Sequence, residues 1–253
     1  KPKIDEYYAK TNKLSLDASL RIKVKLRNKN LGTEKEQEIF LADFPMITEH
    51  GTFIINGVER VIVPQLARSF GVFFTANEIK GKKYFGAKII PVRGAWIEIE
   101  SDADGILYVR VDRKRKFLVS SLLRVFSNLP DKDILAKLKG IDETYEGGAP
   151  FIKNSFAKDS AKTIDDSYLE MYKRLRDSDI VTVNSSKEFL NDLFGKDRYD
   201  LSLVGRFRFN KRFGRAITPK ELAERTLSLD DFVEIIKHIN MLNNTAEATE
   251  DDI

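Results

Sequence analysis

The sequence predicts an α+β fold: a strand-rich first half, with antiparallel or mixed sheets and hairpins, followed by a mainly helical second half. Residues 1–118 contain short apolar runs that alternate with polar residues and are separated by turn signals. From Ser120 onward the apolar residues recur with a period of about 3.6 residues. Because strands and helices fall in separate blocks, the pattern favours α+β over a regular βαβ arrangement.

The strands of the first half are expected to form a β meander. In chain order they are LRIKVKL, EQEIFLA, TFII, ERVIV, GVFFTA, AKIIPVR, AWIEIE and LYVRVD. The dipeptide Asn56-Gly57 predicts a two-residue type I′ turn between TFII and ERVIV. That turn places Phe53 opposite Arg60, with Glu59 one position nearer the turn. Both faces of this hairpin are otherwise apolar, so the arginine and the glutamate are unexpected there.

The second half contains several segments with a helical period and explicit helix starts. Thr218-Pro219-Lys220-Glu221 and Ser228-Leu229-Asp230-Asp231 each combine an N-cap with an acid in the first turn. Residues 140–161 are rich in Gly, Lys, Asp and Ser, and they predict a long loop. The expected helices are Ser120–Phe126, Asp131–Lys139, Asp165–Arg176, Ser186–Phe194, Pro219–Arg225 and Leu229–Leu242.

The composition indicates a folded globular protein and excludes several kinds of site. The chain has 253 residues, of which 42% are hydrophobic, enough to bury a sizeable core. It has no cysteine and only two histidines, which excludes disulfides and zinc–thiolate sites. Lysine and arginine number 43 against 39 acidic residues, and this small excess does not by itself indicate nucleic-acid binding.

Neither a signal peptide nor a membrane span is recognisable, because no apolar run approaches about 20 residues. We therefore expect a cytoplasmic protein. The chain begins at Lys1 rather than at a methionine and stops in the polar sequence EDDI. These ends are typical of a piece of a longer polypeptide.

The sequence carries no self-sufficient active site. Phosphate-binding Walker and GxGxxG loops, GxSxG and HExxH are all missing from it. The pairs Glu98/Glu100, Asp230/Asp231 and Asp251/Asp252 lack a histidine, a cysteine or a third convergent acid. We expect these carboxylates to face solvent or to cap helices, and we expect no catalytic residue and no metal site.

Two basic runs and the single tryptophan suggest contacts with nucleic acid. The runs are Arg110–Lys116 and Arg206–Arg215. If the second run is a strand, Arg206 and Arg208 face phosphates while its phenylalanines face the core or stack on unpaired bases. The alternative is a solvated charged face over ordinary core phenylalanines. Trp96 is likewise either a core residue or a stacking platform.

The segment GTFIINGVERVIVPQLARSFGVFF resembles the hallmark segment of the β subunit of bacterial DNA-dependent RNA polymerase. Further blocks resemble the same family in the same order, among them AKIIPVRGAWIEIE, LYVRVDRKRKF, YLEMYKRLR, DRYDLSLVGRFRFN and the terminal EDDI. The resemblance implies part of a protrusion domain over residues 1–66 and a lobe domain over residues 67–253. In the family, these regions form one wall of the cleft that holds DNA.

The resemblance also implies roles for individual residues. Positions matching the family's pocket for the non-template DNA strand are Arg68, Trp96, Asp112, Arg176, Arg198 and Ile253. Positions matching its rifamycin site are Arg60, Val63 and Gln65. Glu34, Lys35 and Glu36 match an edge on which transcription-repair coupling factors dock by strand addition. This part of the family carries no catalytic residue and no cofactor, because the Mg²⁺ of the polymerase is bound in the β′ subunit.

The implied partners are β′, α and the other polymerase subunits, sigma, DNA and nascent RNA. The chain departs from the family at Phe70, where the family usually has a proline, and at residues 177–181, where it lacks three prolines. Pro64 replaces a residue that is commonly serine. Two other functions remain open: a stand-alone module that binds single-stranded nucleic acid, and a module that only binds proteins.

Overall fold

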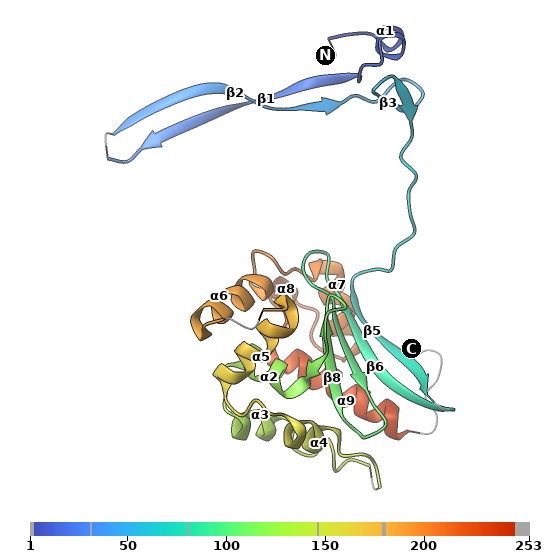
Figure 1. Cartoon of the computed structure of the whole chain (residues 1–253), viewed down its shortest axis with the longest axis vertical. Coiled ribbons are helices and arrows are strands. Elements are labelled where there is room, and N and C mark those ends of the chain that lie inside the picture. The colour runs from blue at the N-terminus through green and yellow to red at the C-terminus, as the bar shows by residue number, and fades with distance from the viewer. Residues whose placement is uncertain (1–2, 31, 80, 146, 179–180, 246–253) are drawn as a thin grey trace. The chain divides into compact units, whose positions relative to one another are not determined.

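The structure is a computed structural model that describes residues 3–30, 32–79, 81–145, 147–178 and 181–245. It divides the chain into two compact units, residues 1–67 and residues 68–253 (Figure 1). The boundary expected from the sequence lies one residue earlier. That these units are a protrusion and a lobe stays a prediction.

In its described residues, the first unit consists of one helix and two β-hairpins. Helix α1 (Glu6–Thr11) precedes a long antiparallel hairpin of β1 (Asp17–Asn28) and β2 (Thr33–Pro45). A short hairpin follows, formed by β3 (Phe53–Ile55) and β4 (Val58–Arg60). Its small core comprises Ala9, Leu16 and Ile54. The sequence predicted the strands of both hairpins and the turn of the second, but not α1.

The turn at Asn56-Gly57 is confirmed. Asn56 has φ 51° and Gly57 has φ 77°, as a type I′ turn requires, and Phe53 pairs with Arg60. A Cβ at position 57 would lie 2.6 Å from the Cα of Lys13, so only glycine fits this close approach. The expected strand ERVIV is wrong beyond Arg60, since no strand is assigned over residues 61–70.

Glu59, one of the two unexpected charges in this hairpin, has partners within the first unit. Its carboxylate accepts hydrogen bonds from Lys10 Nζ at 2.7 Å and from Thr52 Oγ1 at 2.6 Å. The bond from Lys10 contributes most to lowering the pKa of Glu59. Arg60 is exposed to solvent. The glutamate therefore ties the hairpin to α1, whereas the arginine does not enter the core.

The second unit is built on a five-stranded antiparallel sheet whose strands follow chain order, as the meander prediction implied. Tight turns join most neighbours, including one at residues 101–106 in which Asp102 accepts hydrogen bonds from the backbone of Asp104 and Ile106. The strands are β5 (Gly71–Ile79), β6 (Lys82–Ile90), β7 (Ile97–Ser101), β8 (Leu107–Val111) and β9 (Phe117–Leu118).

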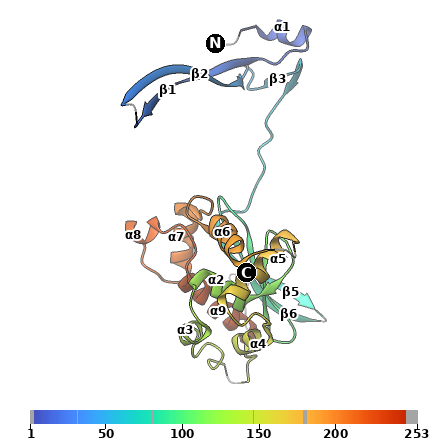
Figure 2. The same cartoon turned by 60° about the vertical axis from the view of Figure 1, so that its left-hand side comes forward.

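Helices make up the rest of this unit, with α6, α7 and α8 at one end and α3 and α4 at the other (Figure 2). The six predicted helices are confirmed, and Ser228 and Asp231 form the expected capping box. The helices are α2 (Val119–Ser127), α3 (Asp131–Lys137), α4 (Phe151–Lys158), α5 (Ile164–Arg176), α6 (Val183–Phe194), α7 (Ser202–Arg212), α8 (Pro219–Ala223) and α9 (Leu229–Asn244).

Two elements contradict the sequence prediction. The expected loop over residues 140–161 contains α4, which buries Phe151, Ile152 and Phe156. The basic run Arg206–Arg215, expected as a strand, lies largely in α7. Arg206 and Phe209 are both buried in the second unit, because residues three apart lie on one face of a helix.

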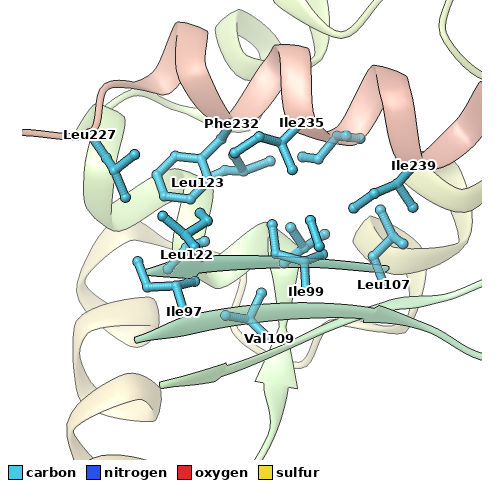
Figure 3. Close-up of a cluster of buried hydrophobic side chains, with 14 of the residues drawn as sticks. Ile97, Ile99, Leu107, Val109, Leu122, Leu123, Leu227, Phe232, Ile235 and Ile239 are labelled. Atoms are coloured by element: carbon cyan, nitrogen blue, oxygen red, sulfur yellow. The ribbon is translucent and has the colours of Figure 1, made fainter. Parts of the chain in front are cut away.

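The core lies between the sheet and the helices. Figure 3 shows α9 lying over the sheet, with Phe232 next to Leu123 and Ile239 next to Leu107. Ile235 and Ile99 belong to the same cluster. Leu122 and Leu123 of α2 join the same cluster, and all of these side chains are almost fully buried. This core holds the β6–β7 loop and the end of β8 in place. Within the described residues, no helix is long and apolar enough to cross a membrane.

Candidate nucleic-acid interface around Trp96

Trp96 and Asp112 are brought together by the register of the sheet. Ile97, the first residue of β7, pairs with Val111, the last residue of β8. Trp96 and Asp112 therefore lie opposite each other just beyond the strands. The Trp96 backbone N–H donates to Asp112 Oδ1 at 2.7 Å, and the Asp112 N–H donates to the Trp96 carbonyl at 2.9 Å. These two hydrogen bonds hold the tryptophan backbone at a defined position.

The Trp96 ring is accessible. Trp96 is 37% exposed, and it lines an open pocket of about 270 Å³ together with Asp112 and Arg113. Asp112 and Arg113 have φ 48° and 58°, so they form a left-handed turn next to the ring. Lys88 Nζ lies 5.5 Å from the ring centroid, where it pairs with Glu98. The pocket itself offers an aromatic face, a carboxylate and the guanidinium of Arg113 at one place.

Arg198 lies on the loop that follows α6, residues 195–201 (the Arg198 loop). This loop is attached to the β6–β7 loop, residues 91–96, which ends in Trp96 (the Trp96 loop). Arg93 and Asp200 form an isolated antiparallel bridge between the β6–β7 loop and the segment after α6. The Arg198 side chain is exposed and its guanidinium pairs with Asp192 at 3.1 Å. An exposed ion pair of this kind is weak, so phosphate can compete for the guanidinium.

Arg176 and Arg68 have different surroundings. Arg176 ends α5, and its guanidinium stacks over the Phe189 ring at 4.6 Å. The next residue, Asp177, pairs with Arg115 at 3.3 Å, which brings the end of α5 to the turn that follows Asp112. The Arg68 guanidinium lies 4.3 Å from the Phe73 ring centroid, and no described contact links it to Trp96. Ile253 lies outside the described residues.

The comparisons with known proteins decide the family. A family model described as RNA polymerase Rpb2, domain 2, matches residues 68–253. The chain belongs to the β-subunit family of DNA-directed RNA polymerases. The DNA-directed RNA polymerase subunit β of Exiguobacterium sp. strain AT1b is 46% identical over 211 residues, 83% of this chain. The corresponding subunits of Clostridium perfringens strain 13 and Clostridium acetobutylicum ATCC 824 are 47% and 44% identical over 77% and 84% of it.

The chain spans only a small part of these β subunits. It covers 17% of the Exiguobacterium protein, 15% of the C. perfringens protein and 16% of the C. acetobutylicum protein. The resemblance to the polymerase β family, inferred from collinear motifs, is confirmed.

The second basic run of this β-subunit segment is not the phosphate-facing strand that alternation predicted. Arg206 is 4% exposed, and its guanidinium forms a two-pronged ion pair with Asp231 at 3.0 and 3.1 Å. Arg215 binds the same carboxylate at 2.5 Å. Arg206 therefore holds α7 against α9, and Arg215, which follows α7, binds the same acid of α9. Arg208 and Lys211 are exposed.

The paired acids Glu98 and Glu100 form ion pairs on the sheet, the second of them with Arg110 of the first basic run. Glu98 pairs with Lys88 at 2.6 Å, and Glu100 pairs with Arg110 at 3.3 Å. Across residues 3–245, apart from the gaps at 31, 80, 146 and 179–180, no three His, Cys, Asp or Glu side chains are grouped so that they could hold a metal ion. The contacts of Glu98 and Glu100 are those of cross-strand ion pairs.

The remaining candidate positions lie in the first unit. Arg60, Val63 and Gln65 are exposed, the last two in a segment without regular structure. Glu34 accepts from Lys25 at 2.6 Å and from Arg27 at 2.5 Å, and the hydrogen bond from Lys25 contributes most to lowering its pKa. The other two candidates, Lys35 and Glu36, are exposed on β2 near the tip of the hairpin. None of these contacts bears on rifamycin or on a docked factor.

The sequence analysis missed two residues of the second-unit site, Gly94 and Tyr199. Gly94 has φ 113°, and the Tyr199 ring packs against it. Both lie in motifs that carried the family resemblance, RGAW and DRYDL. Their closeness in space depends on the bridge between Arg93 and Asp200, which no local pattern indicates.

Proposed function

We propose that this chain is part of the β subunit of a multisubunit DNA-directed RNA polymerase and forms one wall of the cleft that holds DNA. Family membership supports this proposal, and the nucleotidyl transfer itself belongs to the whole polymerase. Its magnesium ion is bound by β′, so this segment grips nucleic acid rather than catalysing. A cytoplasmic location and contacts with β′, α, sigma, DNA and nascent RNA are parts of the same proposal.

The observation that carries the proposal is the exposed Trp96 ring beside Asp112 and Arg113. An unpaired base can stack on the indole, because every base has a flat π face. The carboxylate of Asp112 can accept a hydrogen bond from the base edge, and Arg113 can contact phosphate. Unpaired bases become available where the DNA strands are separated, as in an open bubble. The family resemblance implies that the strand bound here is the non-template strand.

We propose that two further arginines, Arg198 and Arg176, extend this contact along the strand. Arg198 is exposed on the neighbouring loop, and Arg176 reaches the turn after Asp112 through the pair of Asp177 with Arg115. Guanidinium groups suit phosphates because they donate two parallel hydrogen bonds. Arg68 belongs to the pocket by resemblance, and its role stays a proposal.

The test is the binding of a fluorescein-labelled single-stranded oligodeoxynucleotide to the full chain, measured by anisotropy at about 50 and about 200 mM salt. We expect the affinity to fall as salt rises, because arginine contacts release counterions from the phosphates. Trp96→Ala should weaken binding, whereas Tyr7→Ala, which removes an 80% exposed aromatic ring from the first unit, should not. Absence of binding at the lower salt concentration would contradict the proposal.

A second role, docking of transcription factors, is favoured by the β1–β2 hairpin. All of β2 is exposed, and within the described residues it pairs along its length with β1 alone. A free strand edge can accept an additional strand from a partner. We propose that Glu34, Lys35 and Glu36 mark the docking edge for transcription-repair coupling factors. Exchanging the charges of Lys35 and Glu36 should abolish binding of such a factor in a calorimetric titration, and unchanged affinity would overturn this role.

A further inference from the structure

Gly94 lies at a close contact between the Trp96 loop and the Arg198 loop. A Cβ built at position 94 would lie 2.8 Å from Cδ2 of Tyr199 and 3.0 Å from the carbonyl oxygen of Arg198. The first distance is shorter than real side chains allow, and φ 113° is itself a glycine conformation. The glycine therefore lets an aromatic ring and a backbone segment lie directly against the loop that ends in Trp96.

Backbone hydrogen bonds fasten the same two loops on one side of this contact. The N–H groups of Val92 and Arg93 donate to the Asp200 carbonyl at 2.8 and 3.3 Å, and the Asp200 N–H donates to the Arg93 carbonyl at 2.9 Å. The N–H groups of Arg198 and Tyr199 both donate to the Gly195 carbonyl, at 3.0 and 2.8 Å. The Arg198 loop is thus bonded both to the end of α6 and to the β6–β7 loop.

Tyr199 fills the space beneath this junction. It is 1% exposed, and its ring lies 6.0 Å from that of Phe194. Burial raises the pKa of the Tyr199 hydroxyl, which stays neutral at physiological pH. Among the described residues this hydroxyl has no hydrogen-bond partner, so the contact with Gly94 is made by the ring alone.

We infer that Gly94 and Tyr199 are positioning residues that hold the Trp96 ring and the Arg198 guanidinium in one fixed arrangement before DNA binds. This inference rests on the proposed non-template-strand function. A single strand that stacks one base on Trp96 and places a phosphate at Arg198 must match both groups at once. Fixing the two loops beforehand removes the ordering cost that binding otherwise includes. Neither positioning residue needs to touch the DNA.

The test compares Tyr199→Phe, which keeps the ring, with Tyr199→Leu, which removes it but keeps the site apolar. Anisotropy with a fluorescein-labelled single-stranded oligodeoxynucleotide gives the affinity of the full chain, and circular dichroism establishes that each variant is folded. We expect Tyr199→Phe to bind as the wild type does. Tyr199→Leu should weaken binding about tenfold or more. Gly94→Ala gives a second perturbation of the same contact and should act in the same direction.

Adding Arg198→Gln to each Tyr199 variant distinguishes a positioning role of Tyr199 from a role in overall stability. In the Tyr199→Phe chain, Arg198→Gln should weaken binding by at least about fivefold. In the Tyr199→Leu chain it should have little further effect, because the misplaced guanidinium no longer reaches the DNA. A variant that merely lost stability would show the same Arg198→Gln effect in both backgrounds.

The outcomes distinguish this inference from the proposed function. If the wild-type chain binds DNA through Trp96 but Tyr199→Leu and Gly94→Ala bind equally well, the positioning role is overturned and the proposed function stands. Equal effects of Arg198→Gln in both backgrounds overturn the positioning role in the same way. If the wild-type chain does not bind single-stranded DNA, the proposed function fails and this inference fails with it.

Discussion

Trp96 is the only aromatic residue among the described residues that line the pocket, so Trp96→Ala removes its aromatic surface. A buried aromatic that is replaced by alanine in a core costs about 3–5 kcal/mol, because it leaves a cavity. Trp96 is 37% exposed and lines an open pocket, so its removal enlarges a surface hollow instead. Scaling the full burial of a large apolar side chain by the buried two-thirds gives a stability loss of about 1–2 kcal/mol.

The loss in DNA binding should be of similar or greater size. Stacking of a base on an aromatic side chain is worth about 1–3 kcal/mol, which corresponds to an increase in Kd of about 5- to 140-fold. Binding is measured by anisotropy, and stability by urea unfolding followed by circular dichroism. Trp96→Phe is the matched control, since it keeps a smaller stacking face. A loss of about 3–5 kcal/mol in stability with unchanged DNA affinity would refute the reasoning and make Trp96 a core residue.

Three further predictions concern the framework. Asp231→Ala should cost about 3–5 kcal/mol in urea unfolding because it leaves two arginine partners unpaired, one of them buried, whereas Asp230→Ala, next to it, breaks only an exposed ion pair and should cost less than about 1 kcal/mol. Gly57→Ala should lower the thermal midpoint of the first unit, since the added Cβ meets backbone 2.6 Å away. Thr163→Ala should cost about 0.5–2 kcal/mol by removing the N-cap of α5. Hydrogen bonds from Thr163 hold the pKa of Asp166 below its ordinary value of 3.8, so the stability that Asp166 adds is complete above that pH and is lost as pH falls through the lower folded-state pKa.

Each framework prediction has a result that would contradict it. If Asp231→Ala and Asp230→Ala lowered the free energy of unfolding equally, burial of Arg206 would not require the Asp231 carboxylate. An unchanged midpoint for Gly57→Ala would mean that the turn tolerates a side chain. For the cap of α5, the free energies of unfolding of the wild type and of Asp166→Asn should converge below pH 3.8. A difference that stayed constant at lower pH would exclude the capping contribution.

Local patterns predicted most elements of the fold correctly. The meander and six of the helices follow from periodicity, turn residues and caps, all of which act within a few residues. The segment Arg206–Arg215 was predicted incorrectly because arginine and phenylalanine alternate there as they do in a strand. In α7 the buried Arg206 guanidinium donates a hydrogen bond to the carboxylate of Asp231, which lies 25 residues further along the chain. Such a distant partner is invisible to a local pattern.

Helix α4 was missed for a different reason. Phe151, Ile152 and Phe156 have helical spacing, but the segment is short and its flanking residues have the composition of a loop. Only the core that these side chains enter distinguishes the helix from a turn. Tertiary burial therefore overrode the composition.

The site could be predicted as a set of residues but not as an arrangement. Family resemblance named Trp96, Asp112 and Arg198, and the positions of Trp96 and Asp112 follow from the register of β7 and β8. The attachment of Arg198 depends on a single bridge between two loops and on a glycine that admits the Tyr199 ring. These contacts depend on three-dimensional packing. The sequence therefore identified the residues but not their arrangement in space.

The most direct test of the central claim uses the fact that Trp96 is the only tryptophan in the chain. Its fluorescence therefore reports on the pocket alone. Titration with an unlabelled single-stranded oligodeoxynucleotide should quench this fluorescence to saturation, at concentrations that rise with salt. Fluorescence that stays unchanged while the anisotropy of labelled DNA shows binding would place the DNA elsewhere and contradict the assignment of the pocket.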